Sequence, residues 1–325
     1  MTATISQRLG LACTIAFTLL AGAADAALTH GQSAPPAPGT FVWVGDHRLH
    51  VHCMGQGSPT VIFDSGLGGT SLDWSLIQPK VAEHTRACTY DRAGYGWSDR
   101  GPSPRHSRRI VAELEQLLGY SSIGGPYVLV GHSFGGLNVQ LFAKRNPERV
   151  AGLVLVDSSH ERQFEAFDEA GLPSVAPRGN SFMLRNYNNV PSNMPSAVRP
   201  LAQKFAYASD TVVSIHSELA NMRRSAQQLA ADAPLPDIPM AVVIHDPSPY
   251  LASPRSATMA LLWKRLQTDL AKQTSHSRLI VSQSSDHYVQ FADPATVTEA
   301  IVDVLGQARG IDVACQVAAP EPFTC

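Results

Sequence analysis

Short apolar runs alternate with longer amphipathic stretches along most of the chain. The apolar runs are rich in Val, Ile and Leu, which is typical of buried strands. They predict strands at residues 40–44, 47–53, 60–64, 86–91, 127–130, 150–157, 240–245 and 278–282. The amphipathic stretches predict helices at 72–83, 107–118, 137–146, 256–272 and 294–308. Strands that alternate with helices indicate an α/β fold, with a mostly parallel sheet covered by helices on both faces.

One long segment departs from this pattern. Residues 158–239 contain no clear strand, several helix-like pieces and clustered Pro, Asn and Ser. Because a structureless connection of that length is uncommon inside a domain, we predict a largely helical insertion at 158–236. It begins after the sixth predicted strand, near the candidate nucleophile Ser133, so we expect it to form a cap over the site. The predicted core then comprises residues 40–157 and 237–309, followed by a tail at 310–325.

The first 26 residues have the pattern of a secretory signal peptide. Arg8 precedes an apolar run at 9–22, and Ala24-Asp25-Ala26 has the small-x-small form of a cleavage site. The apolar run is short for a bilayer-spanning helix. We therefore predict cleavage near Ala26, export to the periplasm or beyond, and no stable membrane anchor. A retained N-terminal anchor is the alternative. A linker rich in Gly, Ser, Ala and Pro is predicted at 27–39.

Cysteine usage fits an exported protein. The chain has five cysteines, and removal of the signal peptide with Cys13 leaves Cys53, Cys88, Cys315 and Cys325. An even number in an oxidising compartment favours disulfides over buried free thiols. Cys315 and Cys325 bracket a short tail, which favours a local Cys315–Cys325 bridge. Cys53 and Cys88 would then pair with each other.

Composition narrows the range of functions. The chain has 325 residues, of which 44% are apolar and 16% charged, so it can bury a sizeable core. Its formal net charge of −2 favours neither nucleic acid nor an anionic membrane surface as a partner. No Cys and His spacing resembles a metal site, and no cofactor is expected. We therefore expect chemistry on a small molecule. Nothing in the sequence indicates an oligomeric state.

The candidate nucleophile lies between an apolar strand and an amphipathic helix. Residues 127–130 lead into Gly131-His132-Ser133-Phe134-Gly135, a Gly-x-Ser-x-Gly motif. In this context the serine sits on a sharp, strained turn that exposes its hydroxyl. A side chain at either glycine would collide with the neighbouring strand and helix. The alternative interpretation is an ordinary loop that contains a serine.

A serine hydroxyl needs a base, and the base needs an acid that orients it. With a strand–Ser–helix nucleophile, the acid and then the histidine follow later in the chain. His287 comes directly after the eighth predicted strand and is the candidate base. Two acids are possible, since Asp157 ends the sixth strand and Asp246 follows the seventh. We favour Asp157, because Asp246 precedes Pro247 and has the pattern of a turn residue. The structural alternative for Asp157 is capping the following helix.

The developing oxyanion of acyl transfer needs two backbone N–H donors. One is predicted to be the amide of Phe134, directly after the nucleophile. The other is expected from the glycine-rich loop after the third strand, where Leu67 lies between Gly66 and Gly68. An ordinary glycine-rich turn is the alternative interpretation of this loop.

Several segments together resemble the α/β-hydrolase superfamily. The matching blocks are residues 61–69, 90–98, 131–136 and 152–157 and the segment around His287. The resemblance extends over residues 41–307, apart from the cap. It implies an eight-stranded sheet whose second strand is antiparallel to the others and lies beside the fourth. Cys53 and Cys88 would then be neighbours. The block at 90–98 resembles a structural turn.

Two departures from the family pattern matter. Many members have Gly-x-x-Asp after the seventh strand, whereas this chain has Ile244-His245-Asp246-Pro247, a second reason to favour Asp157. The loop after the third strand has Ser65-Gly66 in place of the common His-Gly pair. The nucleophile is Ser and not Asp, so the activity of haloalkane dehalogenases or epoxide hydrolases does not carry over.

The sequence therefore predicts an exported serine hydrolase that cleaves carboxylic esters of small molecules through an acyl-enzyme. An aminopeptidase similar to proline iminopeptidases is one alternative, because it would use the same triad. It would need acidic side chains in the cap, where Glu161, Glu165, Asp168 and Glu169 are available. A non-catalytic binding protein on the same fold is the other alternative.

Overall fold

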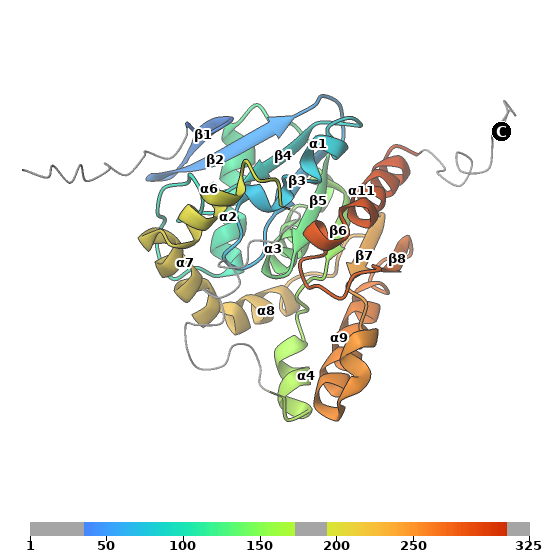
Figure 1. The fold of residues 1–325 in the computed structure, drawn as a ribbon. Coiled ribbons are helices and arrows are strands. Elements are labelled where there is room, and N and C mark those ends of the chain that lie inside the picture. The colour runs from blue at the N-terminus through green and yellow to red at the C-terminus, as the bar shows by residue number, and fades with distance from the viewer. Residues whose placement is uncertain (1–35, 173–193, 311–325) are drawn as a thin grey trace, which may run out of the picture. The chain divides into compact units, whose positions relative to one another are not determined.

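The computed structural model describes residues 36–172 and 194–310 (Figure 1). The predicted signal peptide at 1–26, most of the predicted linker, the Cys315–Cys325 pair and the tail from residue 311 lie outside these ranges.

Eight strands form one sheet in the order β1-β2-β4-β3-β5-β6-β7-β8. Their bounds are Thr40–Val44 (β1), His47–Met54 (β2), Thr60–Asp64 (β3), Ala87–Tyr90 (β4), Tyr127–His132 (β5), Val150–Val156 (β6), Met240–Ile244 (β7) and Ser277–Val281 (β8). β2 pairs antiparallel with β1 and β4, and all other pairs are parallel. The predicted α/β fold, with an eight-stranded, mostly parallel sheet, is confirmed.

A disulfide joins the antiparallel edge of the sheet to its parallel part. Cys53 of β2 lies directly opposite Cys88 of β4, and the two form the predicted bond. Cys88 is fully buried. The bridge closes a separation of 35 residues. It therefore restricts the unfolded chain and stabilises the folded one.

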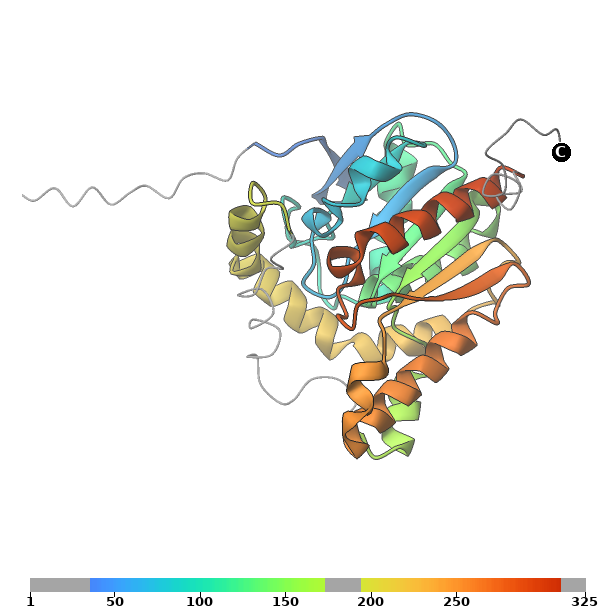
Figure 2. The ribbon, with the colours of Figure 1, turned by 45° about the vertical axis from the view of Figure 1, so that its right-hand side comes forward.

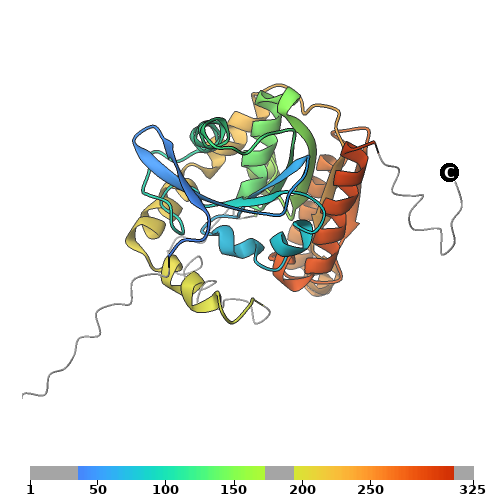
Figure 3. The ribbon, with the colours of Figure 1, turned by 90° about the horizontal axis from the view of Figure 1, so that it is seen from above.

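Helices cover both faces of the sheet, as is usual for parallel strands. Successive side chains of a strand point to opposite faces. In β3, Val61 and Phe63 therefore pack into one core layer and Ile62 into the other. The first layer is closed by α1 and α11, and the second by α2 and α3 (Figures 2 and 3). The bounds of these helices are Gln78–Val81 (α1), Ser107–Tyr120 (α2), Phe134–Arg145 (α3) and Pro294–Ala308 (α11).

The helix predicted at 72–83 is wrong as a continuous element. The chain instead forms a 3₁₀ helix at Ser71–Trp74 (η1) and one turn of α-helix at Gln78–Val81. The Thr70 side chain caps η1, and Asp73 completes a capping box with the Thr70 backbone. Pro79 has no N–H to donate, so it is tolerated only in a first helical turn. This restriction makes the chain start a new helix at Gln78.

The described part of the insertion between β6 and β7 is helical. Its helices are Gln163–Glu169 (α4), Arg199–Ala206 (α6), Ser209–Ala220 (α7) and Met222–Ala230 (α8). α7 packs on the loop after β4, where Thr211 Oγ1 donates to the Gly94 carbonyl at 3.1 Å. α8 packs on the start of α2, where the Ser225 hydroxyl accepts from the Ser107 amide at 3.0 Å. These two contacts are among the polar contacts that attach the insertion to the core.

The remaining helices lie in the connections between the elements already described. They are the 3₁₀ helices Pro147–Arg149 (η2) and Ser248–Ala252 (η3) and the helices Pro254–Leu270 (α9) and Val289–Ala292 (α10). α9 begins with Pro254 in its first turn, and the Ser253 side chain caps it. Within the described ranges, every helix is too short or too polar to cross a lipid bilayer.

Candidate active site

Ser133 occupies a strained turn between β5 and α3. Its backbone has φ 50° and ψ −118°, a conformation that side chains with a Cβ rarely adopt. The Ser133 amide donates to the Val156 carbonyl of the neighbouring strand at 3.1 Å, which helps to fix the turn. This conformation has a free-energy cost, and the surrounding packing maintains it.

The two glycines of the motif permit this packing. A Cβ added to Gly131 would lie 2.8 Å from the Gly136 Cα at the start of α3. A Cβ added to Gly135 would collide with the carbonyl oxygen of Asp64 at the end of β3. No side chain fits at either place, because backbone atoms obstruct both, together with the Val139 side chain at Gly131. The requirement for glycine on both sides of Ser133 is therefore steric.

Ser133, His287 and Asp157 form one row of hydrogen bonds. The Ser133 hydroxyl lies 3.0 Å from Nε2 of His287, and Nδ1 of His287 lies 2.5 Å from Oδ2 of Asp157. Asp157 follows β6 and His287 lies in the loop after β8. The carboxylate of Asp157 is fully buried, whereas 43% of the His287 side chain is exposed. This arrangement can move a proton from the serine to the exposed imidazole.

Asp246, the alternative acid, lies elsewhere. Its carboxylate accepts a hydrogen bond from the Ser248 amide at 2.9 Å, which makes it a turn residue after β7. The structure brings Asp157 and not Asp246 to His287.

Two further side chains donate to the Asp157 carboxylate. Nδ1 of His245 lies 3.0 Å from Oδ1 and 2.9 Å from Oδ2, and Nε1 of Trp263 donates to Oδ1 at 2.9 Å. Burial opposes ionisation of Asp157, but the hydrogen bonds from His245 and His287 outweigh it and hold the pKa of this carboxyl well below its usual range. Asp157 is therefore a buried anion with three side-chain donors. No sequence pattern indicated His245 or Trp263 in this role.

His132 supports the other side of His287. Its Nε2 donates to the His287 carbonyl at 3.0 Å, and its Nδ1 accepts from the Gln290 amide at 3.2 Å. These partners define the neutral tautomer with the proton on Nε2. Burial, together with the nearby His287, lowers the pKa of His132 to about 3. His132 therefore fixes the backbone of the loop that carries His287 and stays uncharged.

The glycine-rich loop after β3 lies against the nucleophile. A Cβ added to Gly66 would lie 3.3 Å from the Ser133 Cβ. Arg92 donates to the carbonyls of Ser65, at 2.5 Å, and Gly66, at 2.8 Å. In a trans peptide the C=O and N–H point in opposite directions, so this bond to Gly66 turns the Leu67 N–H away from Arg92. Leu67 and Phe134, the two predicted donors, thus belong to the segments that flank Ser133.

Arg92 is the centre of a buried ion cluster. It donates to Asp64 at the end of β3 at 2.6 Å and to both carboxylate oxygens of Glu218 in α7 at 3.1 and 3.0 Å. The Tyr95 hydroxyl also donates to Glu218, at 2.8 Å. Burial acts to lower the pKa of Arg92, but the carboxylates of Glu218 and Asp64 outweigh it and raise the pKa well above its usual range. The block at 90–98 therefore also holds the loop beside Ser133, beyond its expected role as a turn.

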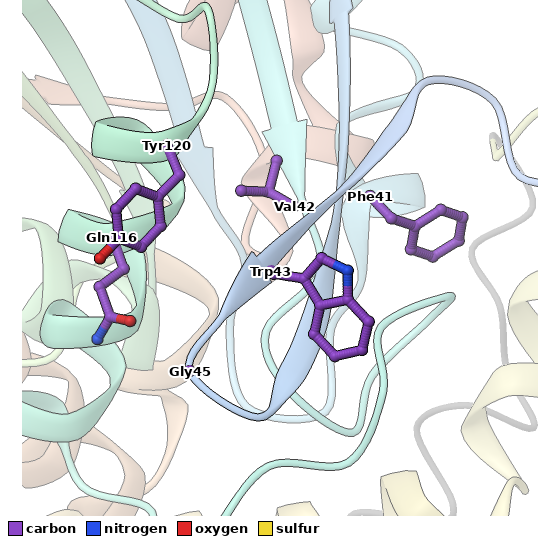
Figure 4. Close-up of a pocket in the computed structure, with 6 residues that line it drawn as sticks. All are labelled: Phe41, Val42, Trp43, Gly45, Gln116 and Tyr120. Carbon is purple, nitrogen blue, oxygen red and sulfur yellow. The ribbon is translucent and has the colours of Figure 1, made fainter.

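A separate hollow of about 530 Å³ lies between the edge strand β1 and α2 (Figure 4). It is lined by Phe41, Val42, Trp43, Gly45, Gln116 and Tyr120. None of these residues belongs to the row of Ser133, His287 and Asp157 or to the segments that flank it. In the part of the chain that the structure describes, no group of three or more His, Cys, Asp or Glu side chains is placed to hold a metal ion.

The sequence matches the Alpha/beta hydrolase family over residues 61–300, more than half of the chain. The chain belongs to the α/β hydrolase family. This family member is 23% identical over 275 residues to an AB hydrolase superfamily protein of Gibberella zeae, covering 74% of this chain and 84% of that protein. It is 34% identical over 106 residues to the uncharacterised protein YqjL of Bacillus subtilis, covering 33% of this chain and 42% of that protein. The first curated relatives are covered over less than half of their own length.

Solved structures of the family share the fold. An enol-lactonase from Burkholderia xenovorans LB400 superposes with a TM-score of 0.60 at 17% identity, over 82% of this chain and 99% of that one. An esterase from Thermogutta terrifontis superposes with a TM-score of 0.57 at 18% identity, over 81% and 94% of the two chains. At these identities the likeness concerns the fold, and the chemistry of this α/β hydrolase family member rests on its own residues.

The ion cluster predicts a large loss of stability for Glu218→Ala. This variant leaves the buried Arg92 without its second carboxylate, so we expect the free energy of unfolding to fall by about 3–5 kcal/mol. Glu218→Gln keeps acceptor and donor atoms in place and should lose less. Asp210→Ala, at an exposed position of the same helix, should lose less than about 1 kcal/mol. Urea unfolding measures all three, and equal losses for Glu218→Ala and Asp210→Ala would contradict a cluster that ties α7 to the core.

Because His132 is buried and neutral, we predict that it lowers the free energy of unfolding in acid. Between pH values of about 3 and 6.5 its folded form stays neutral while its unfolded form binds a proton, so the wild type loses stability as the pH falls. Replacement by Gln, whose Nε2 can still donate to the His287 carbonyl, removes this titration. Relative to the wild type, His132→Gln should gain about 1.4 kcal/mol per pH unit on acidification from pH 6 to pH 4. The exposed His84→Gln is the matched control in urea unfolding, and parallel curves for His132→Gln and wild type would refute the prediction.

Proposed function

We propose that this protein is an exported serine hydrolase that cleaves carboxylic ester bonds of small molecules. The observation that carries the proposal is the row of hydrogen bonds from the strained Ser133 through His287 to the buried Asp157. Nucleophile, base and orienting acid are within contact distance and follow each other along the chain in the order that this fold uses. No cofactor takes part in this chemistry.

The proposed reaction follows from the protonation states in the row. Because the Asp157 carboxylate can only accept, Nδ1 of His287 carries the proton and Nε2 is free to take the one on Ser133 Oγ. Ser133 attacks the ester carbonyl, and His287 accepts that proton and gives it to the leaving alcohol. Water then attacks the acyl-enzyme and gives a proton to His287. The bond between the acyl carbon and Ser133 Oγ breaks, His287 returns the proton to Oγ, and the carboxylic acid leaves. The Asp157 anion stabilises the imidazolium formed in each half of the reaction.

The amides of Phe134 and Leu67 are the proposed oxyanion hole. The Phe134 N–H lies in the first turn of α3, where backbone N–H groups have no acceptor in the helix. The bond from Arg92 to the Gly66 carbonyl supports the orientation of the Leu67 N–H toward the substrate side. Two fixed donors at the place where negative charge develops contribute several kcal/mol to the rate.

The serine nucleophile argues against the activities of some structural relatives. The similar folds include an epoxide hydrolase and an ancestral haloalkane dehalogenase. Attack of a serine on a saturated carbon would give an ether, which has no carbonyl for water to attack. Attack on an ester carbonyl gives an acyl-enzyme that water can hydrolyse. Ester hydrolysis is therefore the reaction that this site completes.

Carboxylates of the insertion offer little support for an aminopeptidase. Glu161 pairs with Lys144 at 3.2 Å and Asp168 with Arg223 at 2.9 Å. A carboxylate already paired with a side-chain cation binds a substrate ammonium less well.

We propose that the helices α4 and α6 to α8 form the cap over the site. The Cys53–Cys88 disulfide supports an oxidising compartment, in agreement with the secretory signal proposed at 1–26.

The nucleophile is tested with a fluorophosphonate probe and a series of p-nitrophenyl esters. We expect the wild type to gain one probe adduct, mapped to Ser133 by peptide mass, and to hydrolyse the esters. Ser133→Ala should remain folded, carry no adduct and lose at least about 10⁴-fold in kcat. Labelling at another residue, or full turnover by Ser133→Ala, would refute the assignment.

The acid is tested by a matched pair of substitutions. Asp157→Asn should lower kcat by about 10⁴-fold, because an amide in this place no longer enforces the tautomer with the proton on Nδ1 of His287. Asp246→Asn changes only a turn after β7 and should stay within about twofold of the wild type. The reverse result in steady-state ester hydrolysis would assign the role to Asp246.

A further inference from the structure

The carboxylate of Asp157 binds a second imidazole, that of His245, which the proposed reaction does not use. His245 directly follows β7 and its Nδ1 contacts both oxygens of the carboxylate, at 3.0 and 2.9 Å. Its backbone N–H also points to Oδ1, at 3.4 Å. One carboxylate therefore links two histidines, and only one of them reaches Ser133.

We propose that His245 is a positioning residue that holds the Asp157 carboxylate in the plane that aligns it with His287. This inference rests on the proposed serine hydrolase function. It concerns how the acid of that site is held in place.

The alignment follows from the number of donors around a fully buried carboxylate. His287 contacts Oδ2, Trp263 donates to Oδ1, and His245 contacts both oxygens. Since Asp157 is inaccessible to water, these side chains define the plane of its carboxylate. Without His245, Oδ1 would keep only the Trp263 donor among side chains, and the carboxylate could rotate away from His287.

The surroundings of His245 determine which of its nitrogens takes up a proton. In its neutral form Nδ1 must carry the hydrogen that faces Asp157, so an added proton enters at Nε2. The side chain is 14% exposed, which leaves it within reach of solvent protons. An imidazolium is better stabilised next to a carboxylate than a neutral ring is.

Charged and titratable groups reach His245 from each neighbouring segment. Asp157 follows β6, Asp246 comes next in the chain, and Asp286 and His287 lie in the loop after β8. The centroid of the Tyr250 ring of η3 lies 5.5 Å from that of the His245 ring. From α9, Trp263 donates to Asp157, and the charge of Lys264 acts on Asp246. Burial acts to lower the pKa of His245, but the hydrogen bond to Asp157 and the charges of Asp157, Asp246 and Asp286 outweigh it, so the pKa is raised.

In both charge states Nδ1 of His245 therefore carries the hydrogen that Asp157 accepts, and the alignment of the carboxylate does not depend on the protonation of His245.

Two variants separate alignment from protonation. In His245→Asn the side-chain Nδ2 occupies the place of Nδ1 and still donates to Asp157, but it cannot take up a proton. In His245→Leu both properties are lost. The exposed His276→Asn is the matched control. Steady-state hydrolysis of a p-nitrophenyl ester is measured from pH 4.5 to 9, with kcat and KM determined separately.

At pH 8 we expect His245→Asn to keep kcat within about threefold and His245→Leu to lose about 10- to 100-fold in kcat with little change in KM, in the range of lost supporting hydrogen bonds. The kcat of His245→Asn should exceed that of His245→Leu throughout the measured pH range, because only the amide donates to Asp157. His276→Asn should overlay the wild type. Should His245→Leu fail to fold, His245→Ala, which also lacks the donor, takes its place.

An independent measurement uses the inactive Ser133→Ala protein. Imidazole ¹⁵N spectra across the same pH range should show a hydrogen on Nδ1 of His245. A neutral His245 with its hydrogen on Nε2, or equal kcat values for folded His245→Leu and wild type, overturns this inference alone. A folded wild type that neither labels Ser133 nor hydrolyses esters overturns the proposed function, and the inference with it.

Discussion

A buried anion organises the end of the sheet where the candidate site lies. Asp157 is out of contact with water, so its charge is stable only while protein donors surround it. Those donors come from the ends of β7 and β8 and from α9. Keeping them in place requires three segments to converge on the end of β6. The same convergence places His287 beside Ser133. The stability of the Asp157 anion and the alignment of Ser133, His287 and Asp157 therefore depend on the same contacts.

A buried cation, Arg92, organises the structure in the same way on the other side of Ser133. Arg92 needs acceptors as strictly as Asp157 needs donors, and it finds them in Asp64, in the carbonyls of the loop after β3, and in Glu218. Through these contacts one guanidinium links the sheet, the loop beside the nucleophile and α7. The insertion is thus joined to the candidate site by charge as well as by packing, and a movement of α7 would disturb the loop that holds Leu67.

The central strands β3, β5, β6 and β7 could be predicted from the sequence because each is a short apolar run buried on both faces. The observed bounds of all eight strands differ from the predicted ones by few residues. The helix at 72–83 failed because Pro79 divides it, a local signal that the apolar periodicity concealed. Ser133 and His287 follow from motif and chain order. The partners of buried charges could not be predicted, since Glu218 lies 126 residues from Arg92 and Trp263 lies 106 residues from Asp157. Only the folded chain brings such pairs together.

The position of the acid, Asp157, at the end of β6 explains which type of residue suits position 245, directly after β7. β7 lies between β6 and β8 in the sheet, so Asp157 must reach across the end of β7 to meet His287. A second carboxylate at position 245 would repel Asp157 across a distance that water cannot screen. A donor satisfies the buried anion instead, and an imidazole can do so with one nitrogen while the other remains free. With the acid at the end of β6, position 245 therefore requires a hydrogen-bond donor. A histidine at this position also places a titratable side chain beside the same carboxylate.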